Sequence, residues 1–266
     1  MSSLGNALSD GAVIAKRNLI KVKRVPDLIV FATLSPIMFV LLFAYVFGSA
    51  IDVPGGNYRE FLIAGIFAQT VIFGSVTTGA GLAEDIQKGL IDRFRSLPMA
   101  RSALLVGRTA SDVVINLITL VVMSLTGLLV GWRIRTSVGE AIAGFLILLF
   151  FAYAFSWVMA CIGLVVQSYE VVNNASFITI FPITFIANTF VPSEGLPTVL
   201  RVIAEWNPVS SLTQATRELF GNTGGAPAPD VWPLANAVPY TLAWTLLILV
   251  IFVPLAVRLY RRAASR

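Results

Sequence analysis

The chain contains no histidine, and its single cysteine is Cys161. Without imidazole groups it has no histidine-based metal site, proton relay or histidine-activated nucleophile. One cysteine also excludes an intramolecular disulfide. Charged residues are scarce, at 12% of the 266 residues, whereas a soluble globular domain carries about 25%. These shortages, together with a mean hydropathy of +0.84, indicate an integral membrane protein.

Nucleotide-binding and catalytic motifs are missing as well. The sequence has no G-x-x-x-x-G-K-[ST] loop, so the chain does not hydrolyse ATP by that route. G-x-S-x-G, H-E-x-x-H and C-x-x-C are also absent. We therefore expect no enzymatic activity, no cofactor and no metal bound by this chain. The formal net charge of +5 is placed as in a membrane protein, and we expect no nucleic-acid partner.

Apolar stretches of about 20 residues, the length that crosses a bilayer, recur along the whole chain. We predict an all-α membrane protein with six transmembrane helices in one domain, residues 1–266. The expected spans cover residues 28–48, 61–83, 113–131, 141–166, 171–190 and 234–257. None of these cores contains Asp, Glu, Lys or Arg, and ion-driven carriers usually place an ionisable group at mid-membrane. Any energy for transport is therefore expected to come from a partner.

Basic residues give the expected orientation of these spans. Fourteen of the nineteen Lys and Arg residues precede the first span, lie between the second and third, or follow the sixth. The remaining five are Arg59, Arg133, Arg135, Arg201 and Arg217. By the positive-inside rule, both termini are cytoplasmic in a multi-pass protein of the plasma or inner membrane.

Residues 1–27 combine apolar and basic positions. Leu4, Leu8, Ala12, Ala15 and Leu19 recur with helical spacing, and Val22 continues the row. This pattern predicts an amphipathic interfacial helix in contact with membrane lipids on the cytoplasmic leaflet. The alternative is a basic tail that only sets the topology.

The connection 191–233 is external in this topology and too long for a structureless loop. Its first part predicts a short amphipathic helix that is broken at Asn207-Pro208, and a second helix follows and ends at Gly221. We expect an external re-entrant helical hairpin before the last span. The alternative is a loop that packs on the spans without a gating role.

The longest densely charged segment between apolar runs extends from Glu84 to Arg108. Ile86, Leu90 and Phe94 are four residues apart and share one helical face, which predicts a surface helix ended by Pro98. Such a ridge fits a groove on a soluble partner, or it rests on the cytoplasmic face of its own bundle. The Glu84-Asp85 pair reads more simply as a helix cap than as a catalytic pair.

The segment Glu84-Asp-x-x-x-Gly89-x-x-Asp92-Arg-Phe-Arg-Ser-Leu-Pro98 resembles the cytoplasmic loop of ABC type-2 exporter permeases, especially the daunorubicin/doxorubicin-resistance group. A second block agrees: Phe190-Val-Pro, Leu196-Pro, Asn207-Pro, Arg217 and Gly221. Ser35-Pro36 and Phe181-Pro182 also fit. The resemblance implies a half-transporter: a second copy of the permease and two ATP-binding cassette subunits, which would bind ATP and Mg²⁺.

The resemblance also assigns roles to residues. It makes 84–101 the cytoplasmic coupling region, with the following ATPase-coupling residues: Glu84, Asp85, Ile86, Gly89, Leu90, Asp92, Arg93, Phe94, Arg95 and Pro98. Polar residues of the second and fifth spans become candidates for the substrate path: Gln69, Thr70, Thr77, Asn173, Ser176, Thr184 and Asn188. Such residues more often form helix–helix hydrogen bonds. The hairpin supplies an external gate: Pro192, Leu196, Trp206, Asn207 and Pro208.

Three functions remain open at this point. The first is the membrane subunit of an ATP-driven exporter of hydrophobic or amphiphilic compounds, such as antibiotics. The second is an exporter of a cell-envelope lipid or glycoconjugate on the same scaffold. The third is an integral-membrane lipid-modifying enzyme, for which Glu84, Asp85 and Asp92 are the available acidic group.

Overall fold

The computed structural model describes residues 12–16, 20, 27–47, 58–89, 103–166, 168–223 and 229–263. All elements in these ranges are helical. In chain order they are α2 (Asp27–Leu42), the π-helix η1 (Phe43–Phe47), α3 (Tyr58–Gly74), α4 (Val76–Gln87), α6 (Ala103–Val130), α7 (Val138–Val166), α8 (Tyr169–Ile186), the 3₁₀-helix η2 (Ser193–Gly195), α9 (Thr198–Trp206), α10 (Pro208–Phe220), α11 (Trp232–Ala235) and α12 (Ala237–Ala263).

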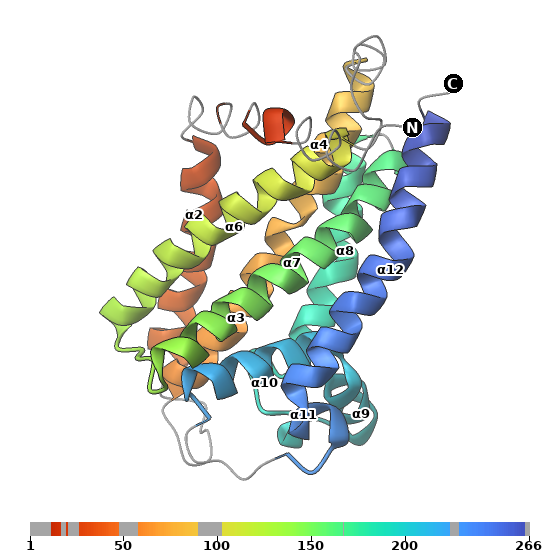
Figure 1. Cartoon of the computed structure of the whole chain (residues 1–266). Helices are drawn as coiled ribbons and strands as arrows, with labels where there is room; N and C mark the ends of the chain where they lie inside the picture. Colours follow the sequence, from red (N-terminus) through yellow and green to blue (C-terminus); the bar gives the residue numbers. More distant parts are fainter. Residues whose placement is uncertain are drawn as a thin grey trace.

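The long helices form a bundle whose members run between two ends of the molecule (Figure 1). At one end α4 finishes, α6 begins and α12 finishes; we term it the α4 end. At the opposite end α9, α10 and α11 lie together, and we term it the hairpin end. Four helices are long and apolar enough to cross a membrane: Tyr58–Gln87, Leu104–Val130, Val138–Val166 and Ala237–Arg262. The segment Thr33–Val46 is a shorter apolar helix.

The α3–α4 column is the centre of the bundle. Its most apolar stretch is 78% buried within the protein, against 17% for the corresponding stretch of α12. Small residues permit this central position, because Gly79 of α4 and Gly163 of α7 bring the two backbones into direct contact. A Cβ at Gly163 would lie 2.1 Å from the carbonyl oxygen of Gly79. α4 is therefore firmly packed against α7.

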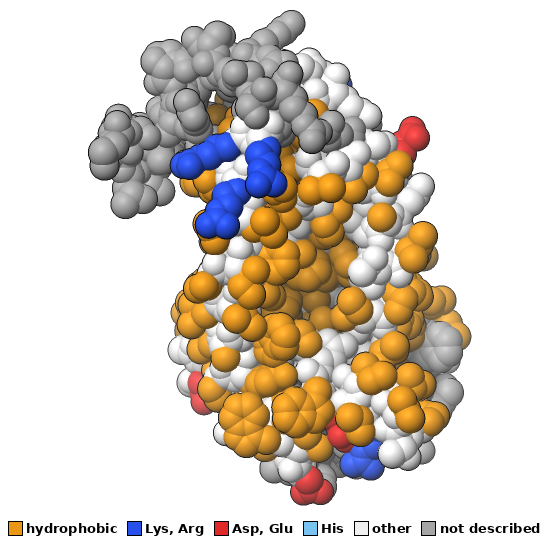
Figure 2. Space-filling view, turned by 90° about the vertical axis from the view of Figure 1, so that its right-hand side faces the viewer, with side chains coloured by type: hydrophobic (Ala, Val, Ile, Leu, Met, Phe, Trp, Pro, Cys, Tyr) orange, Lys and Arg blue, Asp and Glu red, His pale blue; other side chains and the backbone are white. Residues whose placement is uncertain are grey.

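The outer surface of the bundle is apolar over its middle. In Figure 2, hydrophobic side chains cover the centre of the face toward the viewer, and the charged side chains lie toward its two ends. On α12 the exposed apolar residues include Leu246, Val250 and Ile251. A helix that exposes such side chains needs an apolar solvent, so this surface fits the hydrocarbon core of a bilayer.

Local sequence signals set several helix ends. Ser137 and Glu140 form a reciprocal capping box at the start of α7, with a Ser137 Oγ to Glu140 carboxylate distance of 2.7 Å. Asn207 caps α10 by accepting a hydrogen bond from the Val209 amide at 2.9 Å, and Pro208 occupies the first turn. Gly221, with φ +69°, ends α10 in the left-handed conformation. The two helices and their break lie where the sequence predicts them.

The start of α6 differs from the expected span. The helix begins at Ala103, whereas the span was predicted to begin at residue 113. Arg108 and Asp112 therefore lie within the apolar helix Leu104–Val130, in the first turns that precede the span expected at residues 113–131. These charges are tolerated because they contact polar groups of α4, as described below.

The coupling segment also differs from the expected single helix. Glu84, Asp85 and Ile86 form the last turn of α4, and Gly89, with φ +63°, ends the helix. A helix continuous from Asp85 to Arg95 is therefore wrong at Gly89, because that residue adopts the left-handed backbone that stops an α-helix. Leu90, Asp92, Arg93, Phe94, Arg95 and Pro98 lie outside the described residues.

At the α4 end, residues 12–16 are helical and pack on the bundle. Ile14 is 3% exposed and belongs to a cluster with Leu82, Leu104 and Tyr260. Ala12, on the predicted apolar face, is exposed instead. The docked side of this helix is therefore the side of Ile14, and Ala15 of the predicted face is half-buried beside it. The remaining residues of that face, Leu4, Leu8, Leu19 and Val22, lie outside the described residues.

Candidate functional site: a pocket between four helices

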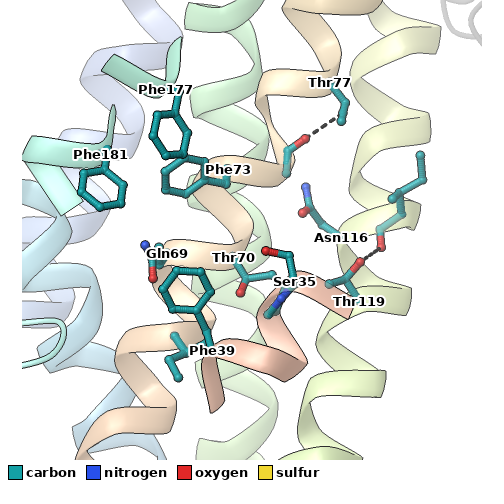
Figure 3. A pocket seen from close by; sticks show the side chains of 14 residues that line it. Ser35, Phe39, Gln69, Thr70, Phe73, Thr77, Asn116, Thr119, Phe177 and Phe181 are labelled. Atoms are coloured by element: carbon teal, nitrogen blue, oxygen red, sulfur yellow. Dashed lines mark hydrogen bonds between the residues drawn. The ribbon is translucent and has the colours of Figure 1, made fainter. Parts of the chain in front are cut away.

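A cavity of about 320 Å³ lies between α2, α3–α4, α6 and α8 (Figure 3). Its aromatic walls are Phe39 of α2, Phe73 of α3, and Phe177 and Phe181 of α8. The remaining lining residues are Ser35, Pro36, Ile66, Gln69, Thr70, Gly74, Thr77, Ile115, Asn116 and Thr119. None of the lining side chains is charged. The cavity is therefore suited to an uncharged, mainly apolar surface with a few hydrogen-bonding groups.

Two amide side chains, Gln69 and Asn116, are among the polar groups of the pocket. No hydrogen bond joins Gln69 or Asn116 to any part of the chain that the structure describes. By contrast, Thr119 donates to the carbonyl of Ile115 at 3.0 Å, and Thr77 donates to the carbonyl of Gly74 at 2.7 Å (Figure 3). The two amides can therefore donate and accept hydrogen bonds with a bound molecule.

The pocket's aromatic wall continues toward the hairpin end. Phe177, Phe181 and Phe185 recur at four-residue spacing on α8, with ring centroids 5.1 and 4.0 Å apart. The ring centroid of Phe190 lies 4.7 Å from that of Phe185 and 4.6 Å from that of Phe43 of η1. Stacked rings of this kind form a continuous apolar surface beside the cavity.

The predicted substrate-path residues divide between the pocket and the helix contacts. Gln69, Thr70 and Thr77 line the cavity. The predicted residues of α8 and the turn after it do not: Asn173, Ser176, Thr184 and Asn188 are absent from its lining. Ser176 and Thr184 are buried, and Thr184 donates to the carbonyl of Ile180 at 3.0 Å. α8 presents phenylalanines to the cavity, and their four-residue spacing was a signal in the sequence.

The predicted gate residues all lie at the hairpin end. Pro192 and Leu196 flank η2. Asn207, 7% exposed, donates through Nδ2 to the carbonyl of Ile183 at 2.8 Å and so ties the α9–α10 junction to α8. Trp206 is 54% exposed, and its carbonyl accepts a hydrogen bond from the Tyr240 hydroxyl at 3.1 Å. Pro208 opens α10.

Arg217 of α10, which the sequence analysis places in the second resembling block and among the external basic residues, is buried at this end. It is 1% exposed and donates to the carbonyls of Phe61 at 3.1 Å, Asn188 at 2.7 Å and Thr189 at 3.3 Å. Its guanidinium also lies 3.4 Å from the centroid of the Phe61 ring. Arg217 thus joins the hairpin to the start of α3 and to the end of α8.

At the α4 end, the described coupling residues are engaged in ion pairs. Lys88 forms an i,i+4 pair with Glu84, and the hydrogen bond and charge of that carboxylate raise the pKa of Lys88. Asp85 faces Arg108 of α6 across 3.9 Å. Ile86 packs beside the cluster that contains Leu82 and Leu104. The described part of the chain holds no group of acidic and Cys side chains arranged for a metal.

Comparison with known proteins agrees with this arrangement. Residues 11–220 match the model of the family described as ABC-2 type transporter. The chain is 33% identical over 245 residues to a daunorubicin resistance ABC transporter permease protein, DrrB1, of Streptomyces coeruleorubidus, with 92% of this chain and 83% of the relative covered.

Two further relatives are more distant. A probable doxorubicin resistance ABC transporter permease protein, DrrC, of Mycobacterium tuberculosis is 25% identical over 239 residues, covering 89% of this chain and 83% of the relative. A putative transport permease, ycf38, of Cyanophora paradoxa is 22% identical over 244 residues, covering 90% of this chain and 83% of the relative. An apolar helical bundle with a central pocket, and a family match over most of its length, lead to one conclusion: the chain belongs to the ABC-2 type transporters, as a membrane-embedded permease.

Proposed function

We propose that this permease is the membrane-spanning half-transporter of an ATP-driven exporter that moves hydrophobic or amphiphilic compounds, of the drug or antibiotic type, out of the cell. The observation that carries the proposal is the uncharged pocket between α2, α3–α4, α6 and α8. Its volume of about 320 Å³ lies at the lower end of the range for small-molecule sites. Four phenyl rings and two uncommitted amides are the surface that an amphiphile with a flat apolar part requires.

ATP hydrolysis in such an exporter takes place in other subunits. The chain carries no phosphate-binding loop, and permeases of its family work with an ABC ATP-binding partner. Our proposal is two copies of that partner, holding ATP and Mg²⁺, and a second copy of the permease. The segment after Gly89, with Leu90, Asp92, Arg93, Phe94, Arg95 and Pro98, would be seated in the partner and receive its movement.

The proposed topology has six spans with both termini in the cytoplasm of the cell membrane. Besides the four long apolar helices, α2 with η1 and α8 run alongside them between the two ends (Figure 1). The excess of Lys and Arg on one side of this topology supports the cytoplasmic placement of the α4 end. The exposed apolar face of α9, with Val199, Val202 and Ile203, supports a hairpin that re-enters the outer leaflet and closes the path.

Two alternatives share part of these features. An exporter of a cell-envelope lipid or glycoconjugate would use the same bundle, but a cavity of about 320 Å³ holds a small amphiphile more readily than a large glycoconjugate. A lipid-modifying enzyme would need free carboxylates at the interface. Glu84 and Asp85 instead face Lys88 and Arg108.

The test is reconstitution of the full complex. The tagged permease is purified from native membranes, and we expect a P-loop ATPase to accompany it. In proteoliposomes the complex should then export a fluorescent hydrophobic probe only when ATP and Mg²⁺ are present. Export by the permease alone, or a complex that moves only lipids, would contradict the proposal.

The pocket itself is tested by a matched pair of variants on α8. Phe181→Ala removes a lining ring, whereas Ile178→Ala changes a side chain that is 72% exposed on the same helix. We expect Phe181→Ala to weaken probe binding about tenfold, or ~1.4 kcal/mol, and Ile178→Ala to leave it unchanged. Equal affinities of the two variants would place the ligand elsewhere.

A further inference from the structure

We propose that Arg108 and Asp112 of α6 clamp α4 at the pocket's edge, so that Asp112 is a positioning residue for the coupling of ATP hydrolysis to transport. This inference rests on the proposed function, because it concerns how movement received after Gly89 reaches the pocket. Three features carry it: a row of polar residues on α6, its contacts with α4, and the rigid packing of α4 against α7.

The row on α6 consists of Arg108, Asp112 and Asn116. They are four residues apart, so they share the face of α6 that meets α3–α4. Asn116 lines the pocket and lies against Gly74, where a Cβ would come within 2.2 Å of the Asn116 oxygen. One helix face thus runs from charged groups near the α4 end to a wall of the cavity.

Asp112 is 3% exposed and is held by the Thr78 hydroxyl of α4, which donates a hydrogen bond to its carboxylate. The Thr77 hydroxyl, which donates to the Gly74 carbonyl at 2.7 Å, lies 3.4 Å from the other carboxylate oxygen. A buried carboxylate without such donors would be costly in an apolar helix bundle. The contact is therefore specific, and it fixes the position of α4 along α6.

Arg108 completes the clamp one turn away. Its guanidinium donates to the carbonyl of Thr77 at 3.0 Å and faces the Asp85 carboxylate across 3.9 Å. The space for it depends on Gly81, because a Cβ there would lie 1.6 Å from the guanidinium nitrogen. Two charged side chains of α6 thereby contact α4 over most of its length.

On its other side α4 is held by α7 through the Gly79–Gly163 contact. α4 is thus a short, firmly packed helix with two distinct ends. Its C-terminal end leads through Gly89 toward the coupling residues, and its N-terminal end meets α3 at the turn of Ser75. Gly74 and Thr77, on either side of that turn, both line the pocket.

Movement of α4 would therefore reach the cavity on two walls at once. Thr77 would move with α4, and Asp112 would carry α6, including Asn116 and Thr119, in the same direction. Without the clamp, α4 could move past α6, and the pocket would change on one wall only. Asp112 acts through these neighbours and does not itself line the pocket.

The experiment uses the reconstituted complex with its ATPase subunits and measures compound exported per ATP hydrolysed. Asp112→Asn keeps the shape of the side chain but weakens its hydrogen bond with Thr78. We expect at least a fivefold loss of export per ATP, with an ATPase rate within twofold of the wild type. Glu140→Gln is the matched control, because it removes an exposed carboxylate that contacts Ser137.

A second pair of variants keeps the inference falsifiable if Asp112→Asn does not fold. Thr78→Val removes the hydroxyl donor at nearly constant volume, and Thr78→Ser retains it. The clamp predicts a loss of export per ATP in Thr78→Val and its retention in Thr78→Ser. A purely structural contact would instead lower thermal stability and leave export per ATP of the folded complex unchanged, which would overturn the inference.

Transmission is also measured directly with a thiol probe. Thr119→Cys places a reactive group on the α6 wall of the pocket, and it is made in a Cys161→Ala background because the two positions are similarly buried, at 5% and 6% exposed. ATP should change the labelling rate of this cysteine when Asp112 is intact, and Asp112→Asn should abolish the change. If ATP still changes the labelling rate in Asp112→Asn, the proposed role of Asp112 is wrong. A wild-type complex that exports nothing with ATP would instead refute the proposed function.

Discussion

The bundle holds an arginine near each of its two ends, one partly exposed and one buried, and the two are stabilised in different ways. Near the α4 end, Arg108 faces the carboxylate of Asp85 and donates to one carbonyl, with 17% of its side chain exposed. At the hairpin end, Arg217 is 1% exposed and donates to three backbone carbonyls that belong to two different segments. Arg217 is thus held by backbone carbonyls, whereas Arg108 combines one backbone carbonyl with a carboxylate.

This difference bears on which end is able to move. One of the three carbonyls belongs to α3 and the other two to the turn that follows α8, so Arg217 holds α10 in one position relative to both segments. Further bonds reinforce that position: Asn222 accepts from the Trp132 indole at 2.7 Å, and Thr136 donates to the carbonyl of Leu219 at 2.6 Å. At the α4 end, Asp112 and Arg108 join α6 to α4, so the two helices can move together. The α4 end is thus expected to transmit movement, and the hairpin end to resist it.

The largest effect is expected from Arg217→Met. It leaves three buried carbonyls without their donor, and we expect the folded protein to lose about 3 kcal/mol of stability. Thermal unfolding of the purified permease in detergent measures the loss. Arg133→Met is the control, because that arginine is exposed and donates to the carbonyls of Leu128 and Trp132. Equal melting temperatures would remove the contrast between the two ends.

An intermediate effect is expected from Gly163→Ala, which tests the packing of α4. The added Cβ would meet the Gly79 carbonyl at 2.1 Å, so α4 and α7 must separate, at a cost of about 2 kcal/mol. Export per ATP should fall as well, because α4 loses its firm support. Gly139→Ala on the same helix has its nearest neighbour 4.0 Å away and should change neither quantity. A Gly163→Ala complex with normal export per ATP would show that α4 needs no such support.

The smallest effect is expected from Arg135→Gln at the hairpin end. Arg135 pairs with Glu60 at 2.7 Å; 62% of the Arg135 side chain is exposed, so water and salt partly screen the interaction, whereas the Glu60 side chain is 8% exposed. We expect a decrease in melting temperature that is smaller than for Arg217→Met and that shrinks in 1 M salt, measured beside the wild type. A decrease as large as that of Arg217→Met would show that the Arg135–Glu60 pair secures this end as much as the buried arginine does.

The parts of the fold that were predictable depend on local signals. Asn207, Pro208 and Gly221 set the ends of α9 and α10 because capping and left-handed turns involve only neighbouring residues. The apolar runs predicted the long helices within a few residues at most ends. Gly89 likewise ends α4 in the left-handed conformation, and the prediction of a continuous coupling helix did not take this glycine into account.

The candidate site was less predictable, because it depends on which helices face one another. α8 is apolar on most of its surface, and its sequence alone does not distinguish the side toward the pocket from the side toward lipid. The polar row expected to line the path packs within the protein, and Phe177 and Phe181 line the cavity instead. For α6, the four-residue spacing of Arg108, Asp112 and Asn116 was available as a signal and marks one face.

The sequence by itself determined a helical membrane protein, the positions of most of its spans and its dependence on another subunit for ATP hydrolysis. Hydropathy and motifs suffice for these conclusions, because water, lipid and phosphate groups impose their requirements on short stretches of chain. Only the tertiary structure decided that Thr77 and Thr78 contact Asp112 and that Arg217 contacts Phe61. Those contacts join residues far apart in the chain, and they arise from the way the helices pack.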